Sequence, residues 1–125
     1  MAATPDPRAD DLDTGFIDTT AAPSGPGCAE CLATDGWWVH LRRCAACGHI
    51  GCCDSSPHQH ATAHFRDTGH RYMTSYEPGE SWWWDYTTEA AFEGPELAPP
   101  THYPPEQGWP APRDRVPANW QQLIH

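Results

Sequence analysis

Cysteine and histidine side chains gather between Cys28 and His70, at spacings typical of metal ligands. Two Cys-x-x-Cys pairs, at 28–31 and 44–47, are separated by twelve residues. Each pair can place two thiolates on one ion at about 2.3 Å, and two pairs in a short chain favour zinc over a redox disulfide. The candidate ligands are Cys28, Cys31, Cys44, Cys47, Cys52, His60, His64 and His70, as many as two closed tetrahedral sites need.

The histidine pair at 60 and 64 predicts a ligand face on a helix, because residues four apart project from the same side. The segment His-Ala-Thr-Ala-His lacks the glutamate that acts as the base in metalloproteases. A closed site also leaves no position for a reactive water. We therefore predict two structural Zn2+ ions per chain and no enzymatic activity.

The aliphatic residues available for a core are too few to stabilise a domain of this size without a cross-link. Between Cys28 and Phe92 the only Leu, Ile or Val residues are Leu32, Val39, Leu41 and Ile50. The first sixteen residues are acidic and contain no apolar run, so they do not read as a secretion signal. We therefore expect a monomeric protein of the reducing cytoplasm, in which clustered thiols bind metal.

The charge balance excludes some partners. The formal net charge is −10 and all seven basic residues are arginine, which disfavours nucleic acid. No segment approaches the roughly 20 apolar residues of a membrane span, so we expect no membrane partner.

The segments between the candidate ligands predict short strands and one helix. The helix has Ser56 as its N-cap and Pro57 at its first position, and it ends near Gly69. We expect strands at 37–43, 49–52, 71–77 and 81–87, the last two joined by a turn at Pro78-Gly79. In the first strand Val39 and Leu41 should share one face.

The two ends of the chain differ from the middle. Residues 1–27 predict a disordered acidic, proline-containing tail, and residues 93–125 form a proline-rich extension. Two alternatives remain open for the extension: a flexible linker, or a segment whose Trp109 and Trp120 pack onto the domain. Its last nine residues could form a short helix that starts at Pro117.

Three consecutive tryptophans, 82 to 84, need a separate interpretation. In a strand Trp82 and Trp84 face one way and Trp83 the other. The rings could replace missing aliphatic residues in the core, line a peptide-binding groove, or divide between both roles. Among the remaining candidates, Cys53 is expected to be a buried thiol, and His58 could compete with His60 for an ion.

Several segments together resemble the UBP-type zinc finger, a ubiquitin-binding domain of some deubiquitinases and a histone deacetylase: CAEC, WWVHLRRCAACGHIGC, HATAHFRDTGH and SYEPGESWWWDY. The resemblance covers about 28–92 and is closest to the bacterial branch, in which GCCDSSP and EPGE recur. It implies an α+β fold: a small, twisted antiparallel sheet of four or five strands with one main helix. It also implies cross-braced zinc sites, Cys28, Cys31, Cys52 and His60 in one, and Cys44, Cys47, His64 and His70 in the other. The sequential alternative places Cys28, Cys31, Cys44 and Cys47 on one ion.

The resemblance also implies a binding site. Family members hold the free C-terminal Gly-Gly of ubiquitin with two aromatic positions and an arginine. Trp38 matches the first aromatic position, and Trp84 and Tyr86 match the second. Asp54 stands at the arginine position, so Arg42 of the neighbouring strand becomes the candidate cation.

Two functions follow. The first is a zinc-binding protein-interaction module that recognises a peptide or protein terminus through Trp38, Arg42, Trp84 and Tyr86. The alternative is a zinc- or redox-responsive regulatory protein whose fold changes when zinc is lost. Acidic residues around the aromatic set favour a basic or neutral partner: Asp54, Glu77, Glu80, Asp85 and Glu89.

Overall fold

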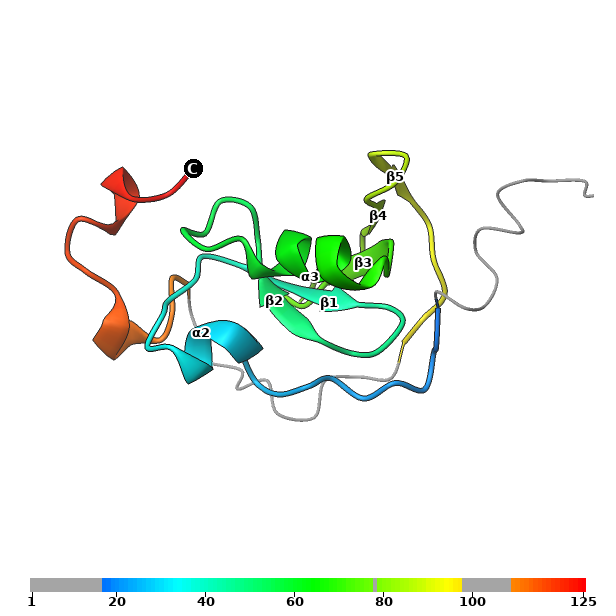
Figure 1. Cartoon of the computed structure of the whole chain (residues 1–125), viewed down its shortest axis with the longest axis horizontal. Coiled ribbons are helices and arrows are strands. Elements are labelled where there is room, and N and C mark those ends of the chain that lie inside the picture. Colours follow the sequence, from blue (N-terminus) through cyan, green and yellow to red (C-terminus); the bar gives the residue numbers. More distant parts are fainter. Residues whose placement is uncertain (1–16, 78, 98–108) are drawn as a thin grey trace, which may run out of the picture.

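The structure is a computed structural model that describes residues 17–77, 79–97 and 109–125. Five antiparallel strands form one sheet in the order β2-β1-β3-β4-β5 (Figure 1). Their bounds are β1 Leu41–Cys44, β2 Ile50–Cys52, β3 Tyr72–Ser75, β4 Trp83–Asp85 and β5 Ala90–Phe92. The predicted α+β class and its small antiparallel sheet are confirmed.

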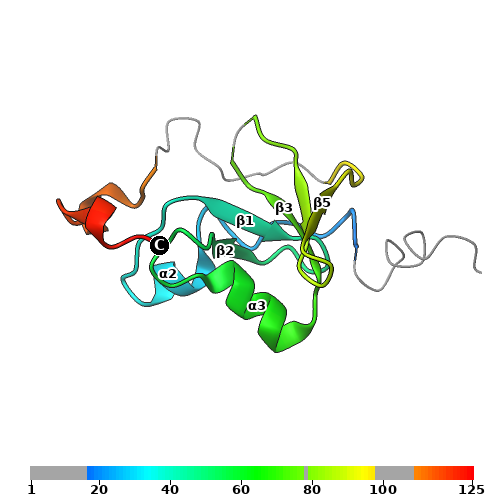
Figure 2. The ribbon, with the colours of Figure 1, turned by 90° about the horizontal axis from the view of Figure 1, so that it is seen from above.

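Within the described ranges, two α-helices accompany the sheet. The main helix, α3 (His60–Thr68), packs on β1 and β2, and the short α2 (Ala29–Ala33) packs on β2. Figure 2 shows α3 beside β1 and β2, with α2 near the N-terminal end of α3. No helix among the described residues is both long enough and apolar enough to cross a bilayer.

The main helix starts three residues later than predicted. Ser56 is buried, and its hydroxyl oxygen accepts a hydrogen bond from the Val39 N–H at 2.8 Å, so it does not cap the helix. The N-cap is Gln59, which has a positive φ of 52°. The predicted end at Gly69 is confirmed: its φ is 77°, and its N–H donates to the Phe65 carbonyl at 2.8 Å.

The first strand is shorter than predicted because Trp37 to His40 do not join the sheet. Trp38 instead pairs with Ala111 of the C-terminal extension through two backbone hydrogen bonds of 2.8 and 3.0 Å. Val39 therefore packs beside Trp37, whereas Leu41 lies in a separate cluster with Trp38. The expectation that Val39 and Leu41 share a face was wrong.

Strand pairing places the tryptophans on both sides of the sheet. Trp83 is 3% exposed and packs beside Tyr72 and Phe92, while Trp84 pairs with Met73 on the opposite face. Trp82, just before β4, is 39% exposed. The core role is therefore confirmed for Trp83, and the peptide-binding role of the other two tryptophans stays a prediction. The turn residue Pro78 lies outside the described residues.

The chain on either side of the sheet also joins the folded unit. In the N-terminal segment, assigned to a tail in the sequence analysis, Asp18 N–H donates to the Ala45 carbonyl and Arg43 donates to the Ala21 carbonyl. The folded part therefore begins before Cys28. Residues 1–16 lie outside the described residues.

The C-terminal extension packs back onto the domain over residues 109–125. Val116, Trp120 and Ile124 pack on a buried cluster formed by Trp37, Val39 and Cys53. The His125 N–H donates to the Ser55 carbonyl at 3.0 Å, which brings the end of the extension to the loop after β2 (Figure 1). This segment contains the 3-10 helices η2 (Arg113–Arg115) and η3 (Trp120–Gln122).

We expect Trp120→Ala to lower the free energy of unfolding by about 2 kcal/mol, because it removes a partly buried ring from an apolar cluster. Trp109→Ala is the matched control: Trp109 is 55% exposed, so its substitution should lower the free energy of unfolding by less. Urea unfolding of the zinc-loaded chain, followed by circular dichroism, measures both. Equal losses in the two variants would contradict the packing role of Trp120.

Candidate functional site

Two clusters of cysteine and histidine side chains lie between the helices and the sheet. Site 1 contains Cys28, Cys31, Cys52 and His60, and site 2 contains Cys44, Cys47, His64 and His70. In each cluster the four donor atoms lie within 4.8 Å of one another. The structure thus groups the residues as the family resemblance implies and separates the two Cys-x-x-Cys pairs.

The spacing of the donor atoms in site 1 fits a tetrahedral zinc ion. The Nδ1 atom of His60 lies 3.2 Å from the Cys28 sulfur, 3.3 Å from that of Cys31 and 3.5 Å from that of Cys52. The sulfurs of Cys31 and Cys52 are 3.9 Å apart. Zinc–ligand bonds of normal length require about 3.6 Å between sulfur and nitrogen and about 3.8 Å between two sulfurs.

Site 2 has a similar spacing but greater exposure. The Cys44 sulfur lies 3.5 Å from His70 Nδ1, and the Cys47 sulfur lies 3.4 Å from His64 Nε2. Cys47 is exposed, whereas all three cysteines of site 1 are 0% exposed. Both donor sets therefore suit Zn2+, giving two zinc sites in the chain, with site 2 the more accessible to solvent and to chelators.

The main helix belongs to both sites. His60 opens α3 and belongs to site 1, while His64, one turn later, belongs to site 2. The remaining ligands of site 1 come from α2, its N-cap and β2. Those of site 2 come from the end of β1, the turn after it and His70, which follows α3. Two ions would thus fasten successive turns of one helix to the sheet.

The three thiols of site 1 can all be deprotonated at once only when a cation is bound. Hydrogen bonds from Cys28 and Cys31 lower the pKa of Cys52 to about 2. The pKa of Cys31 is raised, mainly through its hydrogen bonds with Cys28 and Cys52 and through burial. The pKa of Cys28 is also raised, to about 12. Only one of the three sulfurs therefore ionises readily without metal, and a divalent ion would stabilise all three thiolates.

Backbone N–H groups are placed to stabilise the thiolates. The His60 N–H donates to the Cys52 sulfur at 3.2 Å, and the Cys31 N–H donates to the Cys28 sulfur at 3.4 Å. In site 2 the Ala46 N–H donates to the Cys44 sulfur at 3.4 Å. The start of α3 at His60 has a physical reason, because it places the His60 N–H against the Cys52 sulfur of site 1.

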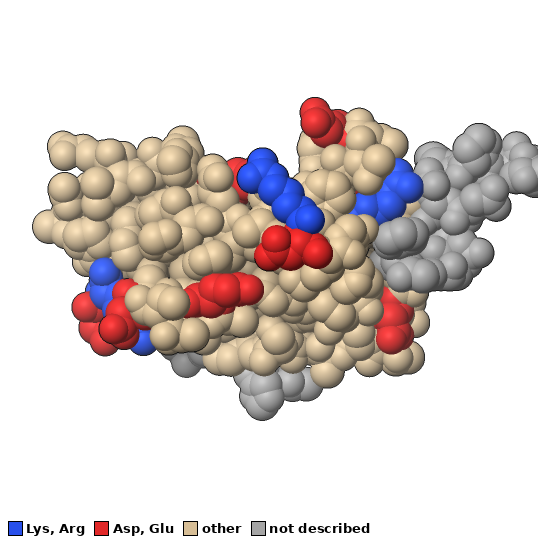
Figure 3. Space-filling model, viewed as in Figure 1, with Lys and Arg blue, Asp and Glu red and all other residues tan. Residues whose placement is uncertain are grey.

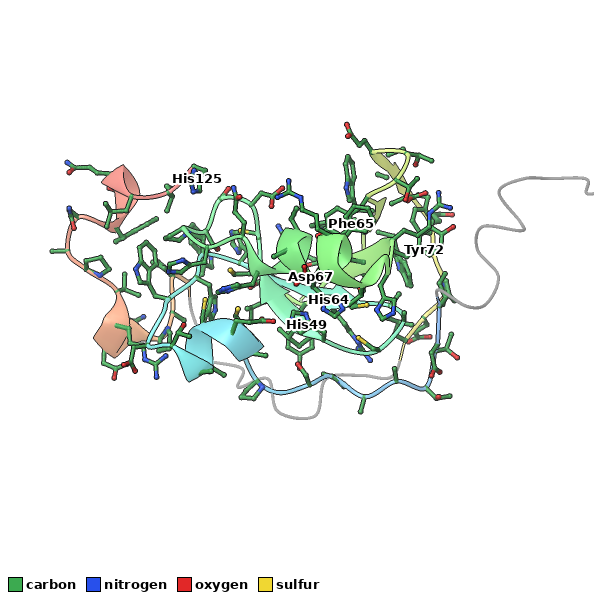
Figure 4. All side chains as sticks on the ribbon, viewed as in Figure 1. His49, His64, Phe65, Asp67, Tyr72 and His125 are labelled. Carbon is green, nitrogen blue, oxygen red and sulfur yellow. The ribbon has the colours of Figure 1, made fainter. Side chains whose placement is uncertain are left out.

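A histidine outside both clusters supports a ligand of site 2. The ring of His49 stacks on that of His64, with centroids 4.0 Å apart and planes 2° from parallel (Figure 4). His49 Nε2 contacts both carboxylate oxygens of Glu30 at 2.8 and 2.9 Å. Because Glu30 lies between two site 1 cysteines in the sequence, this contact links the two sites. Burial, followed by the neighbouring His49 and His70, lowers the pKa of His64 to about 4, which keeps the ring neutral as a ligand must be.

Two further candidates take no part in the clusters. Cys53 is 5% exposed and its sulfur lies 3.4 Å from the Ser56 hydroxyl, facing the cluster under the C-terminal extension. The ring of His58 lies 5.5 Å from that of His60, but His58 belongs to neither cluster.

A groove of about 520 Å³ lies beside site 2, between α3, the sheet and the loop after β2. Three of the four residues predicted for peptide binding line it: Arg42, Trp84 and Tyr86. The other lining residues are Cys53, Asp54, Ser55, Thr62, Phe65, Arg66, Met73, Trp82 and Glu89. Thr62, Phe65 and Arg66 were missed by the sequence analysis, although their spacing of three and four places them on one face of the helix.

The walls of the groove are aromatic. The rings of Phe65 and Tyr86 stack with centroids 4.8 Å apart, and burial raises the pKa of Tyr86 to about 12. The guanidinium of Arg42 lies 4.6 Å from the centre of the Trp82 ring and also donates to the Leu41 carbonyl at 3.0 Å. These contacts hold flat rings and one cation at the surface of the groove.

Trp38 does not line this groove. It is 3% exposed and packs in the cluster that contains Leu41 and Ile50. The Trp38 ring lies so close to Gly27 that a Cβ atom at position 27 would be 2.4 Å from a ring carbon. The predicted peptide-binding role of Trp38 is therefore replaced by a core role, because its backbone pairs with Ala111 instead of continuing β1.

Comparison with known proteins places this site in context. The sequence model of a family described as the Zn-finger in ubiquitin-hydrolases and other protein matches residues 28–97. The solution NMR structure of protein RPA1320 from Rhodopseudomonas palustris is 43% identical, with a TM-score of 0.59. That match covers 81% of this chain and 99% of the other. No curated protein matches the sequence.

We expect the purified protein to contain two zinc equivalents and to release them in two steps on titration with a chelator. Site 2 should empty first because Cys47 is exposed. Cys47→Ser should retain the site 1 ion. Zinc release, read with a colorimetric indicator while circular dichroism follows the fold, measures both steps. A chain that stays folded after complete metal removal would contradict the structural role.

We also expect His49→Ala to weaken zinc binding at site 2 by roughly 10-fold, because outer partners of ligands orient them. Site 1 is the internal control and should change less. Chelator competition on the Co2+-substituted protein, read from its visible absorbance, separates the sites. An equal change at both sites, or none, would refute this role of His49.

Proposed function

Because the chain belongs to the family of zinc fingers found in ubiquitin hydrolases and other proteins, we propose that it is a protein-interaction module that binds a peptide or protein terminus. The groove beside site 2 is the proposed binding site. One observation carries the proposal: Trp82, Trp84, Phe65 and Tyr86 surround a groove of about 520 Å³ that also contains Arg42. Such a set of rings suits an extended peptide, whose backbone and apolar side chains pack on flat aromatic surfaces.

Arg42 is the proposed receptor for a terminal carboxylate. Its guanidinium is held by the Trp82 ring and the Leu41 carbonyl, and no acidic side chain in the described part of the chain pairs with it. An arginine that is positioned in advance binds a carboxylate at a lower entropic cost. Arg42 therefore takes the role that the family resemblance gives to an arginine at the position of Asp54.

The metal sites have a supporting role in this proposal. Each offers four protein ligands, so neither leaves a position for a reactive water, and we propose no enzymatic activity. Zinc instead holds α3, which supplies one wall of the groove through Thr62, Phe65 and Arg66.

The charge distribution supports a protein partner over a nucleic acid. The chain has a formal net charge of −10. On the face in Figure 3 the few basic side chains lie next to acidic ones and form no continuous basic patch. A phosphate backbone would find no extended cationic surface there.

The alternative, a zinc-responsive protein, rests on one observation: the exposure of Cys47 in site 2. Peptide binding and zinc loss are separable. If the chain binds no peptide but releases one zinc to mild chelators with a reversible change of fold, the alternative becomes the better description.

The test uses the zinc-loaded full chain and dye-labelled hexapeptides from a random mixture, prepared with free or amidated C-termini. We expect the free acids to bind at least 5-fold more tightly in fluorescence polarisation, and Arg42→Gln to abolish that preference. Trp84→Ala should weaken both forms. Arg113→Gln is the matched control, since Arg113 is exposed and outside the groove.

Equal affinity for free and amidated peptides would end the idea of C-terminal carboxylate recognition. Binding that survives Trp84→Ala and Arg42→Gln unchanged would move the binding site away from the groove.

A further inference from the structure

The groove contains charged groups of both signs that do not pair with one another. Arg42 and Arg66 supply positive charge, while Asp54 and Glu89 supply negative charge. Among the described residues, no ion pair links any two of these four side chains. A groove with separated, unpaired charges is complementary to a ligand that carries both signs.

Asp54 has a fixed position at one end of the groove. Its Oδ1 atom accepts a hydrogen bond from the Thr62 hydroxyl of α3 at 2.6 Å. Its backbone carbonyl accepts one from the Gln59 side-chain amide at 2.9 Å. The second carboxylate oxygen, Oδ2, makes no hydrogen bond to any described residue, so one acceptor remains for a ligand.

An aromatic ring adjoins this carboxylate. The Thr62 hydroxyl donates to Asp54, and burial together with the Asp54 charge raises the pKa of Tyr86, whose ring stacks on Phe65. A carboxylate that lines a groove together with aromatic rings suits a cation, because an ion pair and a cation–π attraction can act on the same group. A carboxylate ligand at this end would instead be repelled by Asp54.

We propose that Asp54 forms a subsite for a lysine or arginine side chain of the bound peptide, while Arg42 receives the peptide's terminal carboxylate. This inference rests on the proposed function and specifies its partner as a chain end with a basic residue near the terminus. A side chain is favoured over an N-terminal amine, because a peptide whose C-terminus is at Arg42 carries its own amine at the far end.

Asp54 could instead serve only to hold the loop against α3, and the substitution Asp54→Asn separates the two roles. The asparagine side chain retains an oxygen that can accept the Thr62 hydrogen bond, but it removes the negative charge. Thr62→Val is the complementary variant: it retains the charge and removes the hydrogen bond that orients it.

The experiment uses the zinc-loaded full chain and N-acetylated hexapeptides with free C-termini. Lysine, norleucine or glutamate is placed in turn at each of the four positions before the last. At one position or more we expect lysine to bind roughly 5-fold more tightly than norleucine, and glutamate more weakly than both. Asp54→Asn should remove the lysine preference and leave norleucine peptides nearly unchanged, and Thr62→Val should reduce the preference.

Each other outcome counts against the proposal. Equal affinity for lysine and glutamate peptides, or a lysine preference that persists in Asp54→Asn, overturns the subsite but leaves terminus recognition intact. If unacetylated control peptides bind more tightly because of their free N-terminal amine, then Asp54 binds that amine and the assignment to a side chain is wrong. If no peptide binds in any form, the proposed function fails, and the subsite fails with it.

Discussion

The fold depends on metal coordination shared by one helix. His60 and His64, on successive turns of α3, belong to different ligand clusters, and each cluster also draws cysteines from the sheet and its loops. Structural zinc contributes on the order of 10 kcal/mol of binding free energy to the folding of small domains. Contributions of that size suit a domain whose apolar residues are spread over three small clusters instead of one continuous core.

The same coordination determines the shape of the groove. Its walls are one face of α3 and the aromatic residues in and beside β4, and the helix is placed by ligands on its opposite side. Loss of either ion would thus move a wall of the groove without touching a residue in it. The metal sites would thus control peptide binding by positioning α3, although neither ion would contact the proposed peptide.

The loop after β2 is supported on both sides. Its residues Asp54 and Ser55 face the groove, while its Cys53 packs under the C-terminal extension and the Ser55 carbonyl accepts from the His125 N–H. The extension therefore stabilises the end of the groove that contains Asp54. This arrangement connects a segment outside the matched range 28–97 with the specificity proposed for the groove.

Ligand chemistry could be predicted from the sequence because it is local: Cys-x-x-Cys turns, histidines one helical turn apart and a terminating Gly69 act over a few residues. Local signals also predicted one helix and several strands, and the antiparallel α+β class followed from the family resemblance. The start of α3 at His60, the core position of Trp38 and the packing of residues 109–125 on the domain were decided only in the tertiary structure. Each depends on a partner far away in the chain: Val39 for Ser56, and Ala111 for Trp38. Contacts of that kind leave no periodic pattern in the sequence, because they form only when packing brings the two segments together.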